Sequence, residues 1–242
     1  MANILFAVAD VHGCFSALKK ALDEAGFDEN NSEHVFVSCG DLFDRGEENL
    51  KVYNFVKGLK RKILIKGNHE DNLYTILESG VITQDDIDNG TGITAGELLG
   101  KGIIDKKGVY DFRTCSENMS EIKCFLDSMV DYYETGKQVF VHGWLPVVFK
   151  GNRPIVDPEW HEASAEYWKE ARLMEWQQLY GAGAMLEGKT IVCGHRPSYL
   201  AHVYDSLRSN DCSDIFYGDG MIAIDTATVR TGKINVLVVQ EG

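Results

Sequence analysis

Short apolar runs recur along the first part of the chain, and polar residues and then a segment with helical spacing follow each one. The apolar runs cover residues 4–9, 35–39 and 62–65. The helical segments cover residues 15–26 and 48–60, and a third passes through Leu73 and Leu77 and stops at Gly80. Because strands that alternate with helices form layered sheets, the pattern predicts an α/β fold whose ligands gather beyond the carboxyl ends of the strands.

The second half of the chain continues this alternation and ends in β-rich segments. We expect a helix over residues 120–133, with Ser120 as its N-cap, and strands over residues 138–141 and 190–193. The composition of residues 159–180 predicts one long helix between those strands. Two last apolar runs, residues 221–225 and 234–239, are separated by Thr231-Gly232-Lys233 and predict an antiparallel hairpin. With seven or more strands in total, we expect central mixed β-sheets flanked by helices.

Between residues 81 and 116 the periodicity fades, apart from a short piece at residues 95–99. Long connections without strong patterning often cover a site or confer substrate choice, so we expect a substrate-covering insertion here. Residues 86–90 have the acidic spacing of a calcium loop, but the EF-hand pattern needs its glycine one place later and apolar helices on both sides. No Pro/Ser-rich linker divides the chain, which favours a single domain over residues 1–242.

The chain is acidic, since 24 Lys and Arg against 37 Asp and Glu give a formal net charge of −13. No cluster of basic residues provides the stripe that nucleic acid backbones require, so a nucleic acid polymer is not an expected partner. The electrostatic field of this negatively charged chain also repels phosphate groups. A phosphate substrate would therefore have to be attracted by bound cations and a few arginines.

Six cysteines lack C-x-x-C spacing, and Cys39 and Cys193 end apolar runs, so we expect small buried thiols rather than a disulfide framework. The N-terminal apolar run stops at Asp10 and no basic region precedes it. Such a run is too short for a secretion signal or a membrane span. We therefore expect a cytoplasmic protein without a membrane partner, and the sequence does not indicate its oligomeric state.

The heptad Gly40-Asp41-Leu42-Phe43-Asp44-Arg45-Gly46 places two carboxylates and an arginine where the second apolar run opens into a loop. This arrangement suits an acid that holds a metal ion and an arginine that faces a phosphate. Taken alone, the heptad is equally compatible with an Asx turn and a surface ion pair, so other stretches of the chain have to decide.

Five separate apolar runs end in side chains that bind metals or phosphate. These are Asp10 and His12, then Asp41, Asp44 and Arg45, then Asn68 and His69, then His142, and finally His195. A single histidine after a strand is usually structural, but five such strand ends together indicate a shared site. Imidazoles mixed with carboxylates and an amide oxygen suit Mn²⁺, Fe or Zn²⁺ better than Ca²⁺. In two-metal hydrolytic sites a shared carboxylate bridges ions about 3.5–4 Å apart, and Asp41 is placed for that role.

The motifs around these residues resemble the signature of the calcineurin-like metallophosphoesterases, and the match runs from the first strand to Pro197. In order, the motifs are Asp10-Val11-His12-Gly13, Gly40-Asp41-x-x-Asp44-Arg45-Gly46, Gly67-Asn68-His69-Glu70, His142-Gly143 and Gly194-His195. The Asp44-Arg45-Gly46 extension is similar to the phosphoprotein phosphatase branch, which includes phage and bacterial serine/threonine phosphatases and symmetrical diadenosine tetraphosphatases. Phosphodiesterase and nuclease relatives place a metal-binding histidine where this chain has Pro197.

The resemblance implies a metallophosphoesterase-like fold with two divalent metal ions, Mn²⁺ being the expected metal and Fe or Zn²⁺ the alternatives. The first metal would be held by Asp10, His12 and Asp41, and the second by Asp41, Asn68, His142 and His195.

The resemblance also implies the catalytic groups. His69 would be the general acid, and Asp44 would orient it. Arg45 would clamp the phosphate, Arg172 would be a second clamp, and Asn68 would contact the substrate as well as the metal. Arg172 lies in a segment flanked by Trp168 and Trp176, and its helical spacing alone would make it a solvated i,i+4 partner.

The implied reaction is hydrolysis of phosphomonoesters, of the phosphoserine or phosphothreonine type in proteins, by direct attack of a hydroxide that bridges the two metals. A symmetrical bis(5'-nucleosyl)-tetraphosphatase, or another nucleotide phosphohydrolase, would use the same residues and is the alternative. An inactive binding scaffold is a third reading, but such a protein is expected to lack a ligand or the acid, and none is missing here.

Two positions depart from the family pattern: Ala9 stands where Gly is usual, and Gly143 stands where many eukaryotic members have Ala. Both changes exchange small residues, so we expect little effect. His34, His161 and His202 have no motif context, and we expect ordinary surface or hydrogen-bonded roles for them. Asp219 and Asp225 lie near the C-terminal strands; we expect them in solvated loops, with contact to the metal ligands as the alternative.

Overall fold

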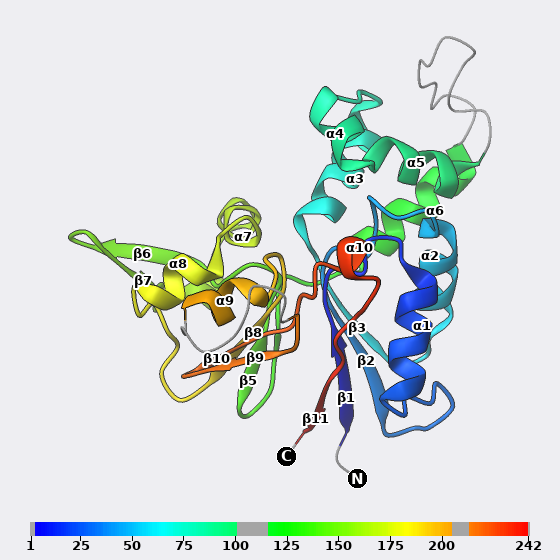
Figure 1. Ribbon diagram of the computed structural model, residues 1–242. Coiled ribbons are helices and arrows are strands. Elements are labelled where there is room, and N and C mark those ends of the chain that lie inside the picture. The colour runs from blue at the N-terminus through cyan, green and yellow to red at the C-terminus, as the bar shows by residue number, and fades with distance from the viewer. Residues whose placement is uncertain (1–2, 101–115, 205–212, 242) are drawn as a thin grey trace.

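Two mixed β-sheets pack face to face in the computed structural model, which describes residues 3–100, 116–204 and 213–241 (Figure 1). The first sheet has the order β11 (Leu237–Gln240), β1 (Ile4–Val8), β2 (His34–Cys39) and β3 (Lys62–Ile65). The second has the order β4 (Tyr133–Glu134), β5 (Gln138–Phe140), β8 (Thr190–Cys193), β10 (Met221–Ala223) and β9 (Phe216–Gly218). A separate hairpin joins β6 (Val147–Lys150) to β7 (Arg153–Val156). The predicted layered α/β fold with central mixed sheets is confirmed.

Helices cover the outer face of each sheet, so the molecule has four layers (Figure 1). Those beside the first sheet are α1 (Phe15–Glu24), α2 (Asn49–Gly58), α3 (Asn68–Ser79) and α6 (Ser116–Asp127), and α5 (Thr91–Leu99) packs against α2, α3 and α6. Those on the second are the 3₁₀ turn η2 (Trp160–Glu162), α7 (Ala165–Arg172), α8 (Trp176–Gly181) and α9 (Tyr199–Tyr204). Two further short helices lie within the described ranges, α4 (Gln84–Asn89) and α10 (Thr228–Thr231).

The strands are apolar on both faces because both faces are covered. In β1, Phe6 and Val8 pack toward the helices, whereas Leu5 and Ala7 join a third core between the sheets. Phe140 of β5 enters that same core from the second sheet. Burial on both faces explains why these segments appear as uninterrupted apolar runs rather than as alternating ones.

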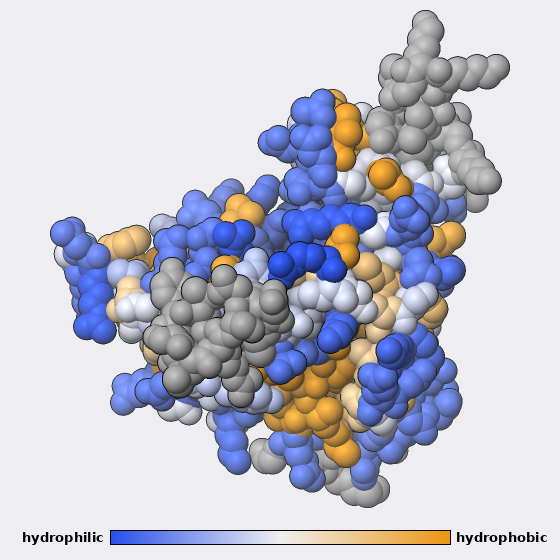
Figure 2. Space-filling view, viewed as in Figure 1, coloured by the Kyte–Doolittle hydropathy of each residue, from blue (hydrophilic) through white to orange (hydrophobic). Residues whose placement is uncertain are grey.

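Parallel pairing brings the carboxyl ends of the central strands to one end of the molecule. β1 and β3 both run parallel to β2, and β5 and β10 both run parallel to β8. Strand β11 runs antiparallel to β1 and places Gln240 opposite Ile4, so both chain ends lie at the other end (Figure 1). On the face shown in Figure 2, a band of hydrophilic residues crosses the molecule near α10, at the end where the parallel strands finish.

The predicted hairpin between the last two apolar runs is wrong. β10 pairs with β8 and β9 in the second sheet, whereas β11 pairs with β1 in the first. The expected turn, Thr231-Gly232-Lys233, is instead the end of α10, where Gly232 is the C-cap in the left-handed conformation. A glycine after a polar residue is typical both of a hairpin turn and of a helix end. Here the chain passes from β10 in the second sheet to β11 in the first, and the glycine ends the short helix between them.

Two helix predictions also need correction. Residues 159–180 form η2, α7 and α8 rather than one helix, because Ser164 is extended and caps α7 through its side chain, and Glu175 is extended before α8. Ser120 is not an N-cap, because α6 already begins at Ser116.

The segment after Gly80 has more structure than its periodicity suggested. Residues 84–99 form α4 and α5, and the acidic stretch that resembled a calcium loop is α4 with Gly90 as its C-cap. The rest of this proposed insertion, residues 101–115, lies outside the described residues.

Two of the four described cysteines match the expectation of small buried thiols. Cys39 and Cys193 are buried and free, and Cys14 is half-buried, but Cys124 is exposed, which contradicts it. Cys115 and Cys212 lie outside the described residues. Within the described ranges, no helix has the length and apolar character needed to cross a bilayer.

Candidate metal centre

The ends of the parallel strands bring the predicted ligands together. Asp10 follows β1, Asp41 follows β2 and Asn68 begins α3 directly after β3. His142 and His195 follow the neighbouring strands β5 and β8 of the other sheet. Backbone hydrogen bonds join these ends, from the Asp10 N–H to the Gly40 carbonyl at 3.1 Å and from the Gly194 N–H to the His142 carbonyl at 2.8 Å.

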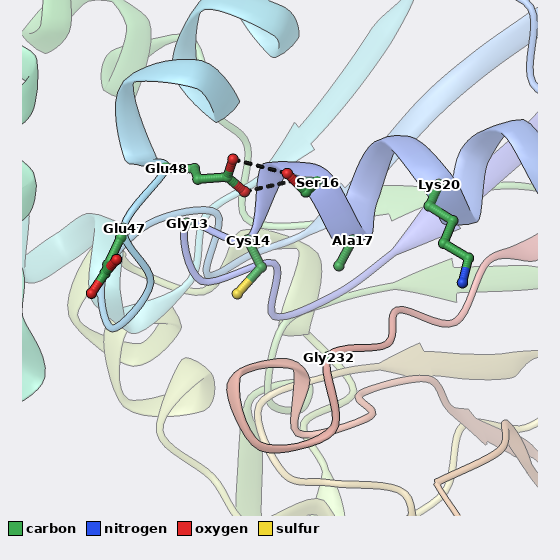
Figure 3. Close-up of a pocket in the computed structure, with 8 residues that line it drawn as sticks. All are labelled: Gly13, Cys14, Ser16, Ala17, Lys20, Glu47, Glu48 and Gly232. Atoms are coloured by element: carbon green, nitrogen blue, oxygen red, sulfur yellow. Dashed lines mark hydrogen bonds between the residues drawn. The ribbon is translucent and has the colours of Figure 1, made fainter.

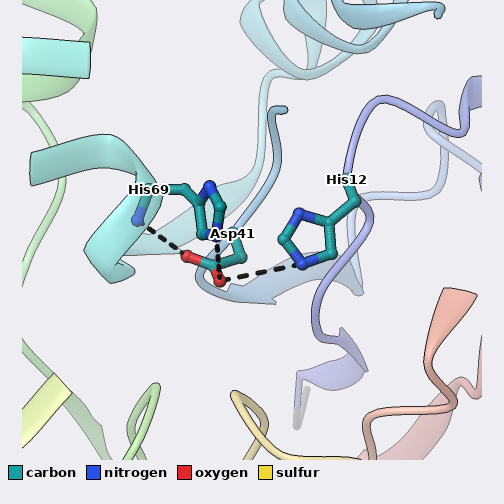
Figure 4. Close-up of side chains that lie close together, drawn as sticks. All are labelled: His12, Asp41 and His69. Carbon is teal, nitrogen blue, oxygen red and sulfur yellow. Dashed lines mark hydrogen bonds and ion pairs between the residues drawn. The ribbon is translucent and has the colours of Figure 1, made fainter. Parts of the chain in front are cut away.

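One carboxylate oxygen, Asp41 Oδ2, lies at the centre of the site. It is 3.4 Å from His142 Nε2. It is 3.8 Å from both His12 Nε2 and His69 Nε2, and Figure 4 shows these two contacts. Asp41 belongs to two groups of candidate ligands, one with His12 and His69 and one with His142 and His195, and within each group the ligand atoms lie within 4.8 Å of one another. This sharing is the arrangement that a carboxylate bridge between two ions requires.

Asp10 and Asn68 flank this centre. Asp10 Oδ1 is 3.9 Å from His12 Nε2, while its Oδ2 accepts the backbone N–H of His195 at 2.8 Å. Asn68 Oδ1 lies 3.0 Å from His142 Nε2. Both oxygens therefore face the same space as the imidazoles.

Backbone carbonyls fix the tautomers of two of the histidines. His12 Nδ1 lies 3.0 Å from the Phe43 carbonyl, and His142 Nδ1 lies 2.8 Å from the Cys39 carbonyl. A carbonyl oxygen can only accept, so each Nδ1 carries a proton and each Nε2 is directed toward Asp41, where it can bind a metal when it is unprotonated. Metal-binding histidines in proteins are held in this way.

The electrostatics of the site also suit cations. Burial lowers the pKa of His12 and of His195 to about 3, which keeps both imidazoles neutral and able to coordinate. Burial, and then the charges of Asp225 and Asp41, raise the pKa of Asp10 well above its usual range. Asp10, Asp41 and Asp225 are thus three carboxylates buried close together, and bound divalent ions would stabilise their charged forms. The residues present therefore fit a pair of such ions.

His69 and Asp44 form a buried pair beside the cluster. His69 Nδ1 donates to Asp44 Oδ2 at 2.6 Å, and the other ring nitrogen faces Asp41. Burial lowers the pKa of His69, but the charge of Asp41 and the hydrogen bond and charge of Asp44 outweigh it, so the pKa is raised. The geometry suits the predicted proton donor, although the same Nε2 is also within reach of a metal ligand position.

The two predicted phosphate clamps differ in their surroundings. The exposed Arg45 points its NH1 to His12 Nε2 at 3.0 Å and its NH2 to His69 Nε2 at 3.1 Å, so its guanidinium lies over the cluster. Arg172 is only 5% exposed and pairs with Asp71, at 2.8 Å, and with Asp131. No contact in the described structure joins Arg172 to the histidine cluster, so its role as a clamp stays a prediction.

The backbone of the site is strained. Of the seven described residues other than glycine with positive φ, six belong to it: Asp10, His12, Asp41, Asp44, Arg45 and His195. Such conformations are costly for residues with a Cβ atom and persist where the surrounding structure enforces them, which is common at functional sites. The ligands are thus held by the fold rather than by the local preference of the chain.

Two buried acids at the site were not among the predicted site residues. Asp225 is 3% exposed at the end of the β10 run, so the expectation of loop solvation is wrong, and its position after an apolar run was the same signal that marked the other strand ends. Glu70 accepts backbone N–H groups of Gly67, Asp41 and Leu42 at 2.8–2.9 Å and so ties the ends of β2 and β3 together. Asp219 is exposed, as expected.

The histidines without motif context are ordinary where they can be assessed. His34 accepts the Asp28 N–H at 3.0 Å, and His161 pairs with Glu134 at 3.0 Å near the surface. The side chain of His202 lies outside the described residues.

A pocket of about 540 Å³ opens beside the loops that carry His12 and Arg45 (Figure 3). Its walls come from the start of α1 and the residues before α2, with Lys20 and Glu47 among them. Glu48 accepts the backbone N–H and the hydroxyl of Ser16 at 2.8 and 2.9 Å, as Figure 3 shows, so this contact ties the heptad loop to α1.

Taken together, a sheet sandwich with acids, imidazoles and an arginine at its strand ends defines a hydrolase of phosphoester bonds that uses a dinuclear type of metal site. The family model of the calcineurin-like phosphoesterases matches residues 5–224, and the chain belongs to this family.

Curated relatives match only part of the chain. The symmetrical bis(5'-nucleosyl)-tetraphosphatase of Aeromonas hydrophila is 40% identical over 79 residues, which are 32% of this chain and 28% of that protein. The protein of the same name from Buchnera aphidicola is 36% identical over 75 residues, 31% of this chain and 26% of that protein. The chain thus spans little more than a quarter of the length of either relative.

Solved structures are similar over nearly the whole chain. One that is provisionally named a diadenosine tetraphosphatase has a TM-score of 0.55 at 14% identity and covers 99% of this chain and 94% of its own. The cold-active protein-tyrosine phosphatase of a psychrophilic Shewanella species also has a TM-score of 0.55, at 17% identity. Its match covers 98% of this chain and 75% of that protein's chain. At these identities the likeness shows the fold alone.

Proposed function

We propose that this chain is a metal-dependent phosphatase that hydrolyses phosphomonoesters of the phosphoserine and phosphothreonine type. The observation that carries the proposal is the position of Asp41 Oδ2, which is shared by two groups of buried imidazoles. A site built in this way holds two cations near one phosphorus atom.

Six residues would hold the ions, with Mn²⁺ as the expected metal. They are Asp10, His12 and Asp41 for one ion, and Asp41, Asn68, His142 and His195 for the other. When bound, the two ions supply the positive charge that lowers the pKa of water toward neutrality and neutralises phosphate oxygens. The mixture of nitrogen and oxygen donors favours Mn²⁺, Fe or Zn²⁺ over Ca²⁺.

The protein groups orient the phosphate and supply the proton. Arg45 is exposed and presents both terminal nitrogens to the cluster, so it is placed to bind two phosphate oxygens at once. Arg172 would be a second clamp, and Asn68 would contact the substrate. His69, whose pKa is raised by Asp41 and Asp44 against the effect of burial, would protonate the departing oxygen through Nε2, while Asp44 holds its Nδ1 proton.

Diadenosine tetraphosphate is a second candidate substrate. It is supported by the names of the curated relatives, which share up to 40% identity with part of this chain. The same groups would act on a phosphoanhydride bond, because its leaving phosphate needs less help from an acid than an alkoxide does.

The test compares turnover of a phosphoserine peptide, diadenosine tetraphosphate and nitrophenyl phosphate at equal Mn²⁺ concentration. Hydrolysis of the phosphopeptide at the highest kcat/KM supports the first substrate, and preference for the dinucleotide supports the second. The enzyme proposal is overturned if no substrate is hydrolysed in a metal-dependent way, which would favour a binding scaffold.

A second measurement separates the two roles open to His69. If His69 is the acid, H69N binds two metals per chain and loses turnover of alkyl phosphates; if it is a ligand, the metal content of the purified variant falls.

A further inference from the structure

Helix α5 presents a polar stripe to the heptad loop. Thr91, Thr94 and Glu97 recur at intervals of three residues, which places them on one face of the helix. The adjacent side of the helix, with Ala95, Leu98 and Leu99, belongs to the apolar core that the helices form with the first sheet. Helix α5 therefore anchors in the core and directs hydroxyl groups and a carboxylate toward the site.

Both threonine hydroxyls donate to the carboxylate of Asp44. Thr91 Oγ1 lies 2.6 Å from Oδ2, and Thr94 Oγ1 lies 2.6 Å from Oδ1. His69 Nδ1 is the third donor, also at 2.6 Å. Asp44 and both threonines have no exposed surface, so these hydrogen bonds are made away from water, where they are strongest.

Threonine hydroxyls within helices often bond back to the carbonyl four residues earlier, which gives a simpler explanation for such residues. That contact exists here from Thr94 Oγ1 to the Gly90 carbonyl, but at 3.4 Å it is far longer than the contact to Asp44. Thr91 is the first residue of its helix, and its described hydroxyl contact is the one to Asp44. The hydroxyls are thus directed to the acid rather than to their own helix.

The helix also fits the strained backbone of the heptad loop. The N–H of Asp44 is held by Asn49 Oδ1 at 2.9 Å and by Thr94 Oγ1 at 3.2 Å. Gly90, at φ +84°, packs so closely that a Cβ atom there would lie 2.9 Å from the nitrogen of Arg45. Glu97 accepts the N–H of Leu50 at 3.1 Å at the start of α2.

We propose that Thr91 and Thr94 are positioning residues for the proton-donating histidine, since they fix the orientation of the Asp44 carboxylate that holds His69 Nδ1. This inference rests on the proposed function, because it takes His69 as the acid. The segment after Gly80, which the sequence predicted as a substrate cover, would thus also support the proton donor through Asp44.

The experiment replaces both hydroxyls by methyl groups in the full chain, as T91V/T94V, because valine keeps the shape of threonine. The kcat for an alkyl phosphate should fall roughly 10–100-fold, within the range that general acid catalysis contributes. The kcat for nitrophenyl phosphate should change less than about threefold, because its leaving group needs little protonation. KM and the metal content should stay near wild type.

Three variants control for a purely structural effect. T91S/T94S restores the hydroxyls and should recover most of the alkyl phosphate turnover. T83V removes a threonine that caps the neighbouring α4 without contacting Asp44, and should leave the ratio of the two substrates unchanged. In a D44N background, T91V/T94V should add little further loss, since the pair acts through Asp44.

The outcomes separate this inference from the proposed function. Suppose that H69N selectively loses turnover of the alkyl phosphate, but T91V/T94V lowers kcat equally for both substrates or T91S/T94S does not restore it. The threonines are then structural, and this inference is wrong while the proposed function stands. A readout without turnover is the Nδ1 proton resonance of His69 in ¹⁵N-histidine-labelled protein. It should shift in T91V/T94V and not in T83V, and an unchanged resonance overturns the inference even if the enzyme proposal has failed.

Discussion

Replacement of Gly143 by Ala should destabilise this protein, although the family pattern made the exchange look harmless. Gly143 follows the ligand His142 and packs against the last turn of α7. A Cβ atom there would lie 2.5 Å from the Arg172 carbonyl oxygen and 2.6 Å from that of Ala171. Ordinary contact begins at 3.4 Å, so 3.4 − 2.5 gives a retreat of roughly 0.9 Å that the neighbouring backbone must make.

Helix α7 cannot retreat without further loss. The Trp144 N–H donates to the Ala171 carbonyl at 3.0 Å, and the Arg172 side chain is tied to Asp71 at 2.8 Å. Overpacking of this kind costs typically about 1–3 kcal/mol, and a weakened hydrogen bond adds about 1 kcal/mol. We therefore expect G143A to lose about 2–4 kcal/mol of unfolding free energy and to bind Mn²⁺ more weakly, since His142 is the adjacent residue.

Urea denaturation followed by circular dichroism measures the first effect, and titration of activity with Mn²⁺ measures the second. Gly181 offers a matched control, because a Cβ atom at that helix end would meet no atom within 4 Å. G181A should keep or slightly raise the urea concentration at the midpoint of unfolding. A G143A protein with the midpoint of the wild type would refute the steric reasoning and show that α7 yields at no cost.

Further predictions concern the acid, the second arginine and the metals. The pKa of His69 is raised by Asp41 and Asp44 against the effect of burial, and the general acid must be protonated to act. Activity should therefore fall as pH rises through that pKa. In a profile of kcat against pH, D44N should move this fall to lower pH, because it removes one of the charges that raise the pKa. R172A should weaken inhibition by inorganic phosphate and lower the unfolding free energy by about 1–3 kcal/mol in urea titrations, because it leaves Asp71 without its partner. Chelation should abolish turnover and lower the Tm in calorimetry, and added Mn²⁺ should restore both, since the ions neutralise crowded carboxylates.

The sequence predicted those site residues whose signal is local. His142 and His195 each end an apolar run, and a strand buried on both faces leaves such a run in any sequence. Parallel pairing then brings the ends of separate strands to one edge, so local signals sufficed to predict a shared site. Asp225 carried the same signal after β10 and was missed only because no motif accompanied it.

Other features depend on tertiary contacts that no local pattern reports. The spacing of Thr91, Thr94 and Glu97 fits a helix face, but nothing in the sequence says that this face meets Asp44. The crossing from β10 to β11 was equally hidden, because a turn within a hairpin and the end of a short helix use the same glycine signal at Gly232. Asp44 lies 47 and 50 residues from the two threonines, and β11 pairs with β1 near the start of the chain, so neither partner is indicated by neighbouring residues.

The strained backbone explains why local propensity is a poor guide at this site in particular. Asp41, Asp44 and Arg45 all adopt positive φ, a conformation that their side chains disfavour, so the isolated heptad would not take this shape. Contacts from outside the heptad hold it: Glu70 accepts the Asp41 N–H at 2.9 Å, and α5 packs against Asp44 and Arg45. The ligands are consequently preorganised at the expense of local stability. It follows that substitutions of Glu70, or of Thr91 and Thr94 in α5, should lower catalysis although these side chains would touch no substrate, because they hold the heptad from outside.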